Sequence, residues 1–276
     1  MDSIEEVILS YKENDHSVFQ QKLSLKDIMT ERIQFRNALL NETVREAFYG
    51  VPAIFDALPV IGGADRKSNT ATFFGILDRR NKIDMNLSVG SQMDRAAARP
   101  LPLSMSIIEY IVTRRQQRMH LICDEKSRQV VGLVTVHDLA RLPVRLALFA
   151  ALLDLEDSVG QTIEKFGGPE ANWDRLISNN SVRLLDEFNK SRVKAYGPDG
   201  GGSLILEMGF GLKLSILKGI SSLGLLGNLR LANTNSLRLL RNDIAHTKPL
   251  RNLHSLSQDV QHALFLTREL KQRLQS

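Results

Sequence analysis

The sequence predicts an α+β protein in which a strand-rich N-terminal half precedes an all-helical C-terminal half. Residues 23–140 contain short runs of Val, Ile and Leu separated by turn residues, in an order that occurs twice. From about residue 140 onward, apolar residues recur at helical spacing and Gly and Pro interrupt the stretches. At 276 residues, the chain is long enough for two domains, each with its own core.

The first copy of the N-terminal pattern opens with the letters LKDIMT at residues 25–30. A helix is predicted over residues 43–48, and a short buried strand over residues 58–61. A turn over residues 62–68 then leads into a second strand over residues 73–77.

The second copy repeats this order, starting with LPL at residues 101–103. A helix over residues 106–113 is followed by a strand over 120–123, a turn over 124–128 and a strand over 130–134. The two copies predict a βαββ-type repeat of about 60 to 70 residues.

The residues that close each copy resemble the end of a CBS motif. They read GILDRRN at residues 75–81 and GLVTVHDL at residues 132–139, and the opening letters DIMT also resemble the motif. The resemblance covers roughly residues 20–145. It implies a CBS pair (Bateman module) over residues 21–141, behind an N-terminal helical segment of residues 1–20.

In proteins that resemble this module, a hydroxyl residue and an acidic residue three positions later bind an adenosine nucleotide. The second copy has them as Thr135 and Asp138, after Gly132. A carboxylate can accept hydrogen bonds from both ribose hydroxyls, while the hydroxyl residue donates to phosphate. The resemblance therefore implies that Gly132, Thr135 and Asp138 bind AMP, ADP or ATP as a regulatory ligand.

Two observations limit this assignment. The first copy has Asp78 and Asn81 in the corresponding places, and an extra carboxylate beside a phosphate is repulsive. In the second copy, residues 135–138 could instead form only a strand-to-helix junction, with Asp138 as its N-cap.

Five helices joined by short loops are predicted in the C-terminal half, which is typical of an antiparallel bundle. They span residues 141–166, 173–193, 204–220, about 225 or 229 to 245, and 257–274. In the first helix, one broad apolar face is predicted to contain Leu142, Leu146, Phe149, Leu152 and Leu153.

The fourth helix ends with the letters RNDIAH at residues 241–246. Cleavage of RNA through its own 2′-hydroxyl needs a proton acceptor, a proton donor for the leaving oxygen, and positive charge at the phosphorane. Histidine is the side chain type suited to proton transfer near neutral pH, which His246 provides, and Arg241 offers paired donors to phosphate oxygens. This chemistry requires no metal, and no metal site is predicted.

The segment and the bundle around it, over residues 142–276, resemble a HEPN domain. The signature arginine, polar residue and histidine match Arg241, Asn242 and His246. Many HEPN proteins are metal-independent endoribonucleases in which two protomers form a shared cleft. The resemblance therefore implies these three catalytic residues, a homodimer and an RNA substrate, in a toxin or phage-defence setting.

Helical geometry constrains the motif. Arg241 and His246, five positions apart, cannot lie one above the other on a regular helix. Pro249 should place His246 in the last turn, where the helix dipole favours a cation. Alternatively, such a pair only satisfies carbonyls or a carboxylate at a helix end. The acidic residues of the first bundle helix could position Arg241, although a solvated acidic face is favoured; they are Asp154, Glu156 and Asp157.

Composition narrows the classes of protein. Cys123 is the only cysteine, which excludes an intramolecular disulfide and a cysteine-based zinc site. The acidic N-terminus does not resemble a signal peptide, and the apolar runs are too short to span a bilayer, so we expect a cytoplasmic protein without membrane contact.

The net charge of +5 lies entirely in residues 141–276. It permits a polyanionic partner, and solubility is the alternative explanation.

The sequence thus predicts a metal-independent endoribonuclease with a composite HEPN active site at a homodimer interface. Adenosine nucleotide binding to the CBS pair would regulate it, by biasing two states of different affinity. The alternative is a non-catalytic, nucleotide-responsive dimeric binding or scaffold protein.

Overall fold

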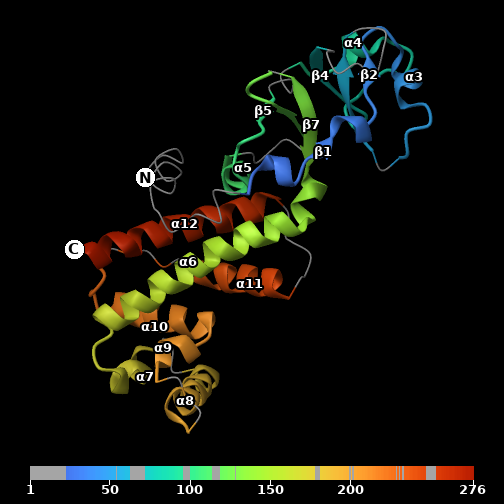
Figure 1. Ribbon diagram of the computed structural model, residues 1–276. Coiled ribbons are helices and arrows are strands. Elements are labelled where there is room, and N and C mark those ends of the chain that lie inside the picture. Colours follow the sequence, from blue (N-terminus) through green and yellow to red (C-terminus); the bar gives the residue numbers. More distant parts are fainter. Residues whose placement is uncertain are drawn as a thin grey trace. The chain divides into compact units, whose positions relative to one another are not determined.

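The computed structural model of the chain describes residues 23–53, 55–62, 72–95, 100–113, 119–127, 129–177, 181–198, 200, 202–227, 229, 231, 233–246 and 253–276. Their contacts form two compact units (Figure 1). The strand-rich unit comprises Lys22–Tyr110 and Arg114–Val144, and the helical unit includes Ile111–Thr113 and Arg145–Ser276. The helical segment predicted at residues 1–20 lies outside the described residues.

The first half of the strand-rich unit has βαββ connectivity. It consists of β2 (Ala38–Leu39), α3 (Val44–Phe48), β3 (Ala57–Ile61) and β4 (Phe73–Asp78). Strand β2 pairs parallel to β3, and β3 pairs antiparallel to β4. A capping box starts α3, because the Thr43 hydroxyl accepts a hydrogen bond from the backbone N–H of Glu46 and the Glu46 carboxylate accepts one from the backbone N–H of Thr43.

The second half repeats this connectivity, which confirms the predicted repeat. Its elements are β5 (Leu101–Pro102), α5 (Ile107–Thr113), β6 (Met119–Cys123) and β7 (Val130–Thr135). Strand β5 pairs parallel to β6, and β6 pairs antiparallel to β7. The 3-10 helix η5 (Val136–Ala140) follows β7 directly. The mixed α+β class is confirmed.

The segment that opens the first copy joins the sheet of the second copy. After η2 (Leu25–Asp27), strand β1 (Thr30–Glu31) pairs antiparallel to β7, giving the order β1-β7-β6-β5. The 3-10 helix η3 (Arg32–Gln34) then leads to the first copy, whose β4 forms a bridge to Asp94 after α4 (Val89–Gln92). Each copy therefore receives a segment from the chain that precedes the other copy.

Buried hydrophobic side chains stabilise the strand-rich unit. One cluster lies within the first copy and includes Val44, Phe48, Leu58, Val60 and Leu77. A smaller cluster joins the two copies, because Ile76 of β4 packs with side chains from β6 and β7: Met119, Leu121 and Leu133.

The helical unit contains α6 (Leu142–Phe166), α8 (Val182–Tyr196), α10 (Phe210–Ser222), α11 (Thr234–Ala245) and α12 (Leu253–Gln275). Short elements separate them: η6 (Glu170–Asn172), α7 (Trp173–Leu176) and α9 (Leu204–Glu207). The five predicted helical regions are present. Two of them are each divided into two helices. The second region consists of α7, which ends before its C-cap Ile177, and α8; the third consists of α9, whose C-cap is Met208, and α10, whose N-cap is Gly209.

Helix α6 buries a different face from the predicted one. Leu142, Leu146 and Leu153 are exposed, by 66%, 43% and 46%. The buried side chains are Val144, Ala147, Leu148, Ala151, Leu152, Leu155, Val159 and Ile163. The prediction was wrong because apolar residues surround the first turns of this helix, so helical spacing alone does not select one face.

Helix α11 runs opposite to α6, as the predicted antiparallel bundle requires, whereas α12 runs in the same direction as α6. The Nζ of Lys165 lies 2.9 Å from the carbonyl oxygen of Leu274, so α6 and α12 end side by side (Figure 1). Arg145, near the start of α6, lies instead 3.5 Å from the carbonyl oxygen of Asp243, near the end of α11. Within the described part of the chain, no helix combines the length and the apolar content that a membrane crossing requires.

Candidate functional site

Helix α11 carries the predicted catalytic motif on its flank. Leu237, Leu240 and Ile244 form its buried face, which leaves Arg241 and Asn242 partly exposed. The helix ends at Ala245, and His246 is its exposed C-cap residue. This confirms the predicted placement of the histidine at a helix end. Pro249, which led to that prediction, lies outside the described residues.

A half-buried carboxylate of α6 faces Arg241. The Oε1 of Glu156 lies 3.0 Å from the Nζ of Lys213, and its Oε2 lies 4.0 Å from the Nε of Arg241. The side chains are 16%, 8% and 34% exposed, respectively. Within the described residues, the buried Nε of Arg241 has no hydrogen-bond partner. Glu156 can therefore orient Arg241 without occupying its guanidinium in a two-pronged salt bridge.

The prediction that the acidic residues of α6 form a solvated face is wrong for Asp154 and Glu156. Glu156 pairs with Lys213 of α10, and the Asp154 carboxylate accepts hydrogen bonds of 2.7 and 2.9 Å from Lys271 of α12. Only Asp157 is exposed. The acidic residues therefore connect helices, because each faces a lysine of a neighbouring helix.

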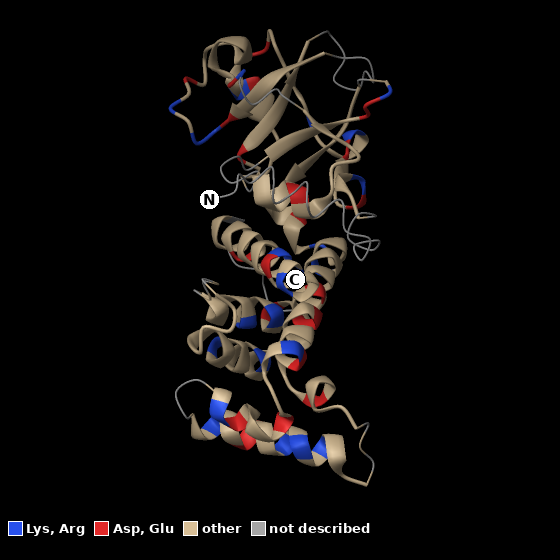
Figure 2. Cartoon of the chain, turned by 90° about the vertical axis from the view of Figure 1, so that its left-hand side faces the viewer, with Lys and Arg blue, Asp and Glu red and all other residues tan. Residues whose placement is uncertain are grey.

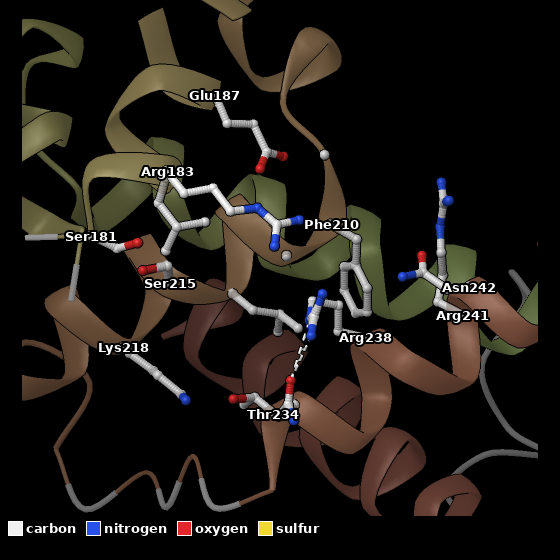
Figure 3. A pocket seen from close by; sticks show the side chains of 15 residues that line it. Ser181, Arg183, Glu187, Phe210, Ser215, Lys218, Thr234, Arg238, Arg241 and Asn242 are labelled. Atoms are coloured by element: carbon white, nitrogen blue, oxygen red, sulfur yellow. Dashed lines mark hydrogen bonds between the residues drawn. The ribbon is translucent and has the colours of Figure 1, made fainter. Parts of the chain in front are cut away.

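Arg241 and Asn242 line a cavity of about 480 Å³ between α8, α10 and α11. Three further basic side chains line it, Arg183 from α8, Lys218 from α10 and Arg238 from α11. Figure 3 shows the guanidinium groups of Arg183 and Arg238 in the middle of this cavity. Clustered guanidinium and ammonium groups suit an anionic ligand, because each offers several donors and a positive charge.

Positive charge gathers in the cavity rather than over a whole helix surface. Along α8, basic and acidic residues are interspersed (Figure 2). Outside the cavity, Lys190 of α8 is paired with Asp186 at 2.7 Å. His246 is not among the residues that line the cavity. The structure thus brings two of the three predicted catalytic residues to the cavity and places the third at the end of the same helix.

Sequence reasoning missed the other basic residues of the cavity. Arg183 and Lys218 come from helices distant in the sequence, and no motif marks them. Arg238 had a signal, because it lies three positions before Arg241 and therefore on the same side of one helix.

In the strand-rich unit, Thr135 and Asp138 are hydrogen-bonded to each other. The backbone N–H and the hydroxyl of Thr135 donate to Asp138 Oδ2, at 2.7 and 2.8 Å. The Arg141 guanidinium contacts Asp138 Oδ1 at 2.6 Å. Thr135 is thus the N-cap of η5 and Asp138 its third residue, so the alternative with Asp138 as N-cap is corrected. The buried carboxylate already has three of its roughly four acceptor positions in use.

Close packing requires a glycine at position 132. A Cβ there would lie 2.7 Å from the Sδ of Met29 and 2.8 Å from the carbonyl oxygen of Thr30. Gly75 of the first copy has the same role, because a Cβ there would lie 2.5 Å from the carbonyl oxygen of Asp94. The glycines of both copies leave room for the segment that precedes the other copy in the chain, which is β1 at Gly132 and the bridge at Asp94 at Gly75.

The first copy lacks a free carboxylate at the corresponding place. Asp78 accepts hydrogen bonds from the Nε and NH2 of Arg80, at 3.0 and 2.6 Å. The backbone N–H of Asn81 donates to the Asp78 carbonyl oxygen. Within the described residues, no group of three or more His, Cys, Asp or Glu side chains is arranged to hold a metal ion.

Neither a protein-family model nor a curated protein matches the sequence. About half of the chain matches CBS domains of known structure. The CBS domain of a bacterial CNNM/CorC family Mg²⁺ transporter in complex with ATP is 20% identical, with a TM-score of 0.35, over 52% of this chain and 95% of that one. A hemolysin-like protein containing a CBS domain from Oenococcus oeni is 15% identical, with a TM-score of 0.34, over 50% and 96%. A functionally unknown conserved protein domain from Neisseria meningitidis is 17% identical, with a TM-score of 0.35, over 49% and 85%.

Proposed function

We propose that this chain is a metal-independent endoribonuclease of the HEPN type, controlled by an adenosine nucleotide that binds a CBS pair. One observation carries the catalytic half of the proposal. Arg241 and Asn242 line a cavity rich in basic side chains, and His246 is exposed at the end of the same helix. The resemblance of residues 241–246 to the HEPN motif supports a toxin or phage-defence setting.

The roles of the residues follow from the chemistry of RNA cleavage. The 2′-hydroxyl of the substrate attacks the adjacent phosphorus, and the bond to the 5′-oxygen breaks. Arg241, oriented by Glu156, holds the phosphorane oxygens as their negative charge develops. His246 gives a proton to the leaving 5′-oxygen, and the Asn242 amide hydrogen-bonds to the phosphate.

A homodimer would complete the site. The reaction needs one group that accepts the 2′-proton and one that protonates the leaving oxygen. One chain contributes one motif histidine, His246. In a shared cleft, the histidines of two copies divide these tasks, which is why we propose a composite active site.

The regulatory half of the proposal places an adenosine nucleotide at Gly132, Thr135 and Asp138. The resemblance to the CBS motif and the two βαββ copies support it. A nucleotide at Asp138 competes with the Thr135 hydroxyl for the same carboxylate oxygen. Binding is therefore coupled to the start of η5, which leads in the chain into α6. The nucleotide acts as a regulator to the extent that it prefers one state of this junction.

A nuclease assay in EDTA tests the catalytic half. We expect the wild-type protein to cut single-stranded RNA, and Arg241→Ala and His246→Ala to lower the rate by about a hundredfold or more. His254→Ala is the matched control, because His254 is an exposed histidine of α12 outside the motif. Equal cutting by all four proteins would exclude the motif from catalysis. An inactive wild-type protein would favour the non-catalytic, dimeric binding protein.

Calorimetry with AMP, ADP and ATP tests the regulatory half. We expect Asp138→Asn to weaken nucleotide binding by about tenfold or more, because it removes the charge that accepts the ribose hydroxyls. Glu46→Gln is the matched control, because Glu46 forms the same kind of capping box with Thr43 in the first copy. If Asp138→Asn binds the nucleotide as tightly as the wild-type protein, Asp138 is not part of the site.

A further inference from the structure

The cavity beside the motif has basic side chains without matching acidic ones. Four lining residues are Lys or Arg, whereas Glu187 is the only acidic one. In the described part of the chain, no carboxylate pairs with Arg183 or Lys218. Within the described residues, Glu187 forms no ion pair with them, and its Oε1 lies beside Gly209, where a Cβ would be only 2.9 Å away. Gly209 is the N-cap of α10, and a helix N-terminus favours a carboxylate.

The central guanidinium of the cavity is held in place. Arg238 donates to the Oδ1 of Asn235 from its Nε at 3.3 Å and from its NH2 at 2.9 Å (Figure 3). Gly211 of α10 makes room for it, because a Cβ there would lie 2.8 Å from the Cδ of Arg238. The amide of Asn235 is neutral, so it fixes the orientation of the guanidinium without cancelling its charge.

From these observations we infer that the cavity between α8, α10 and α11 binds the phosphodiester backbone of single-stranded RNA next to the bond that is cut. The inference rests on the proposed function, because Arg241 and Asn242 belong both to the motif and to the cavity wall. A strand whose reacting phosphate lies at Arg241 continues into the cavity, where Arg183, Lys218 and Arg238 hold its neighbouring nucleotide. A volume of about 480 Å³ is in the range of small-molecule sites.

The choice of RNA over a free mononucleotide follows from the spread of the charges. The four basic residues come from three helices, and Figure 3 shows Arg241, which also belongs to the motif, to one side of Arg183 and Arg238. One terminal phosphate would satisfy only part of this set. A strand with successive phosphates can contact donors on all three helices, and each contact adds to the salt dependence of binding.

Fluorescence anisotropy of a labelled single-stranded RNA tests the inference. It is measured in EDTA with the His246→Ala protein of residues 1–276, so that the RNA stays intact. We expect Arg183→Gln and Arg238→Gln each to weaken binding by about tenfold. Each should also reduce, by about 0.7, the magnitude of the slope in a plot of the logarithm of the association constant against the logarithm of the salt concentration. Lys190→Gln is the matched control on α8, because Lys190 is exposed and paired with Asp186.

A variant that keeps every charge tests whether RNA binding depends on the arrangement of the cavity or only on the positive charge of the protein. Gly211→Ala crowds Arg238 at its Cδ and suits a helix, so it should weaken RNA binding without unfolding the protein. The inference is overturned if these variants bind RNA as tightly as the parent protein, or if Lys190→Gln weakens binding equally. It is also overturned if AMP or inorganic phosphate binds in an Arg183-dependent way while RNA binding does not depend on Arg183.

These outcomes are distinguishable from those of the nuclease assay. Binding that depends on Arg183 and Arg238, in a protein whose wild type does not cut, removes the catalytic proposal and keeps the RNA site. Cutting that depends on Arg241 and His246, with normal binding and cutting by Arg183→Gln and Arg238→Gln, removes the RNA site from this cavity and keeps the catalytic proposal.

Discussion

Glu156→Gln perturbs both the stability of the helical unit and the position of Arg241. The change removes the negative charge between Lys213 and Arg241 and keeps the size of the side chain. The Lys213 side chain is 8% exposed, and within the described residues Glu156 is the only carboxylate that contacts its ammonium group. The variant therefore leaves a buried cation whose only remaining partner is a neutral amide.

The size of the effect can be worked from the geometry. Opposite charges 3.0 Å apart attract by about 5 kcal/mol at an effective dielectric constant near 20, before the cost of desolvation. Removing one partner of a fully buried pair costs about 3–5 kcal/mol. Because Glu156 is 16% exposed and the Gln amide can still accept a hydrogen bond, we expect a loss of about 2–3 kcal/mol in the free energy of unfolding.

Urea unfolding followed by circular dichroism measures this loss. Asp157→Asn, one residue further along α6 and exposed, is the control and should change stability by less than about 0.5 kcal/mol. The double variant Lys213→Met with Glu156→Leu should recover most of the stability, because an apolar pair replaces the buried ion pair. A Glu156→Gln protein as stable as the wild type, or a double variant as unstable as the sum of the two single ones, would refute the reasoning.

Three further predictions concern other parts of the chain. Gly219→Ala should lower the free energy of unfolding by about 3 kcal/mol in urea, because a Cβ there would lie 1.9 Å from the carbonyl oxygen of Leu176. Burial lowers the pKa of His262, so the unfolded chain takes up a proton at a higher pH than the folded protein does. The free energy of unfolding should therefore decrease as the pH falls below the ordinary value of 6.5, and His262→Gln should remove that part of the decrease when urea midpoints are compared across pH. Thr135→Val should cost about 1 kcal/mol in thermal unfolding, because it removes the N-cap hydroxyl of η5; an unchanged midpoint would exclude the capping role.

The repeat and the helix that carries the motif could be predicted because their signals are local. Two copies of one pattern define the βαββ units, and the helical spacing around residues 237–246 defines α11 and its end. The pairing of β1 with β7 could not be predicted in this way, because a strand of two residues, Thr30–Glu31, has no periodicity of its own. Its signal is indirect: the glycines at positions 75 and 132 leave room for a crossing segment.

The cavity could not be predicted from the sequence, for a related reason. Its basic residues are separated by long stretches of chain, and only the packing of α8, α10 and α11 brings Arg183, Lys218 and Arg238 together. Burial of Lys213 is equally hidden, since a lysine in an amphipathic helix is expected to face water. The prediction for the face of α6 failed because its first turns are apolar on nearly every side.

The segment from Thr135 to Asp138 meets two physical requirements with the same atoms. A hydroxyl residue followed three positions later by an acidic residue can form a capping box, and others in the chain start at Ser24 and Thr43. The same spacing is what the CBS resemblance assigns to ribose and phosphate. If a nucleotide binds there, it must displace a capping interaction worth about 1 kcal/mol, which lowers its apparent affinity by several-fold. That cost makes the start of η5 responsive to the ligand. A nucleotide that bound Asp138 without disturbing Thr135 would have no such effect on this junction, and regulation would have to arise elsewhere.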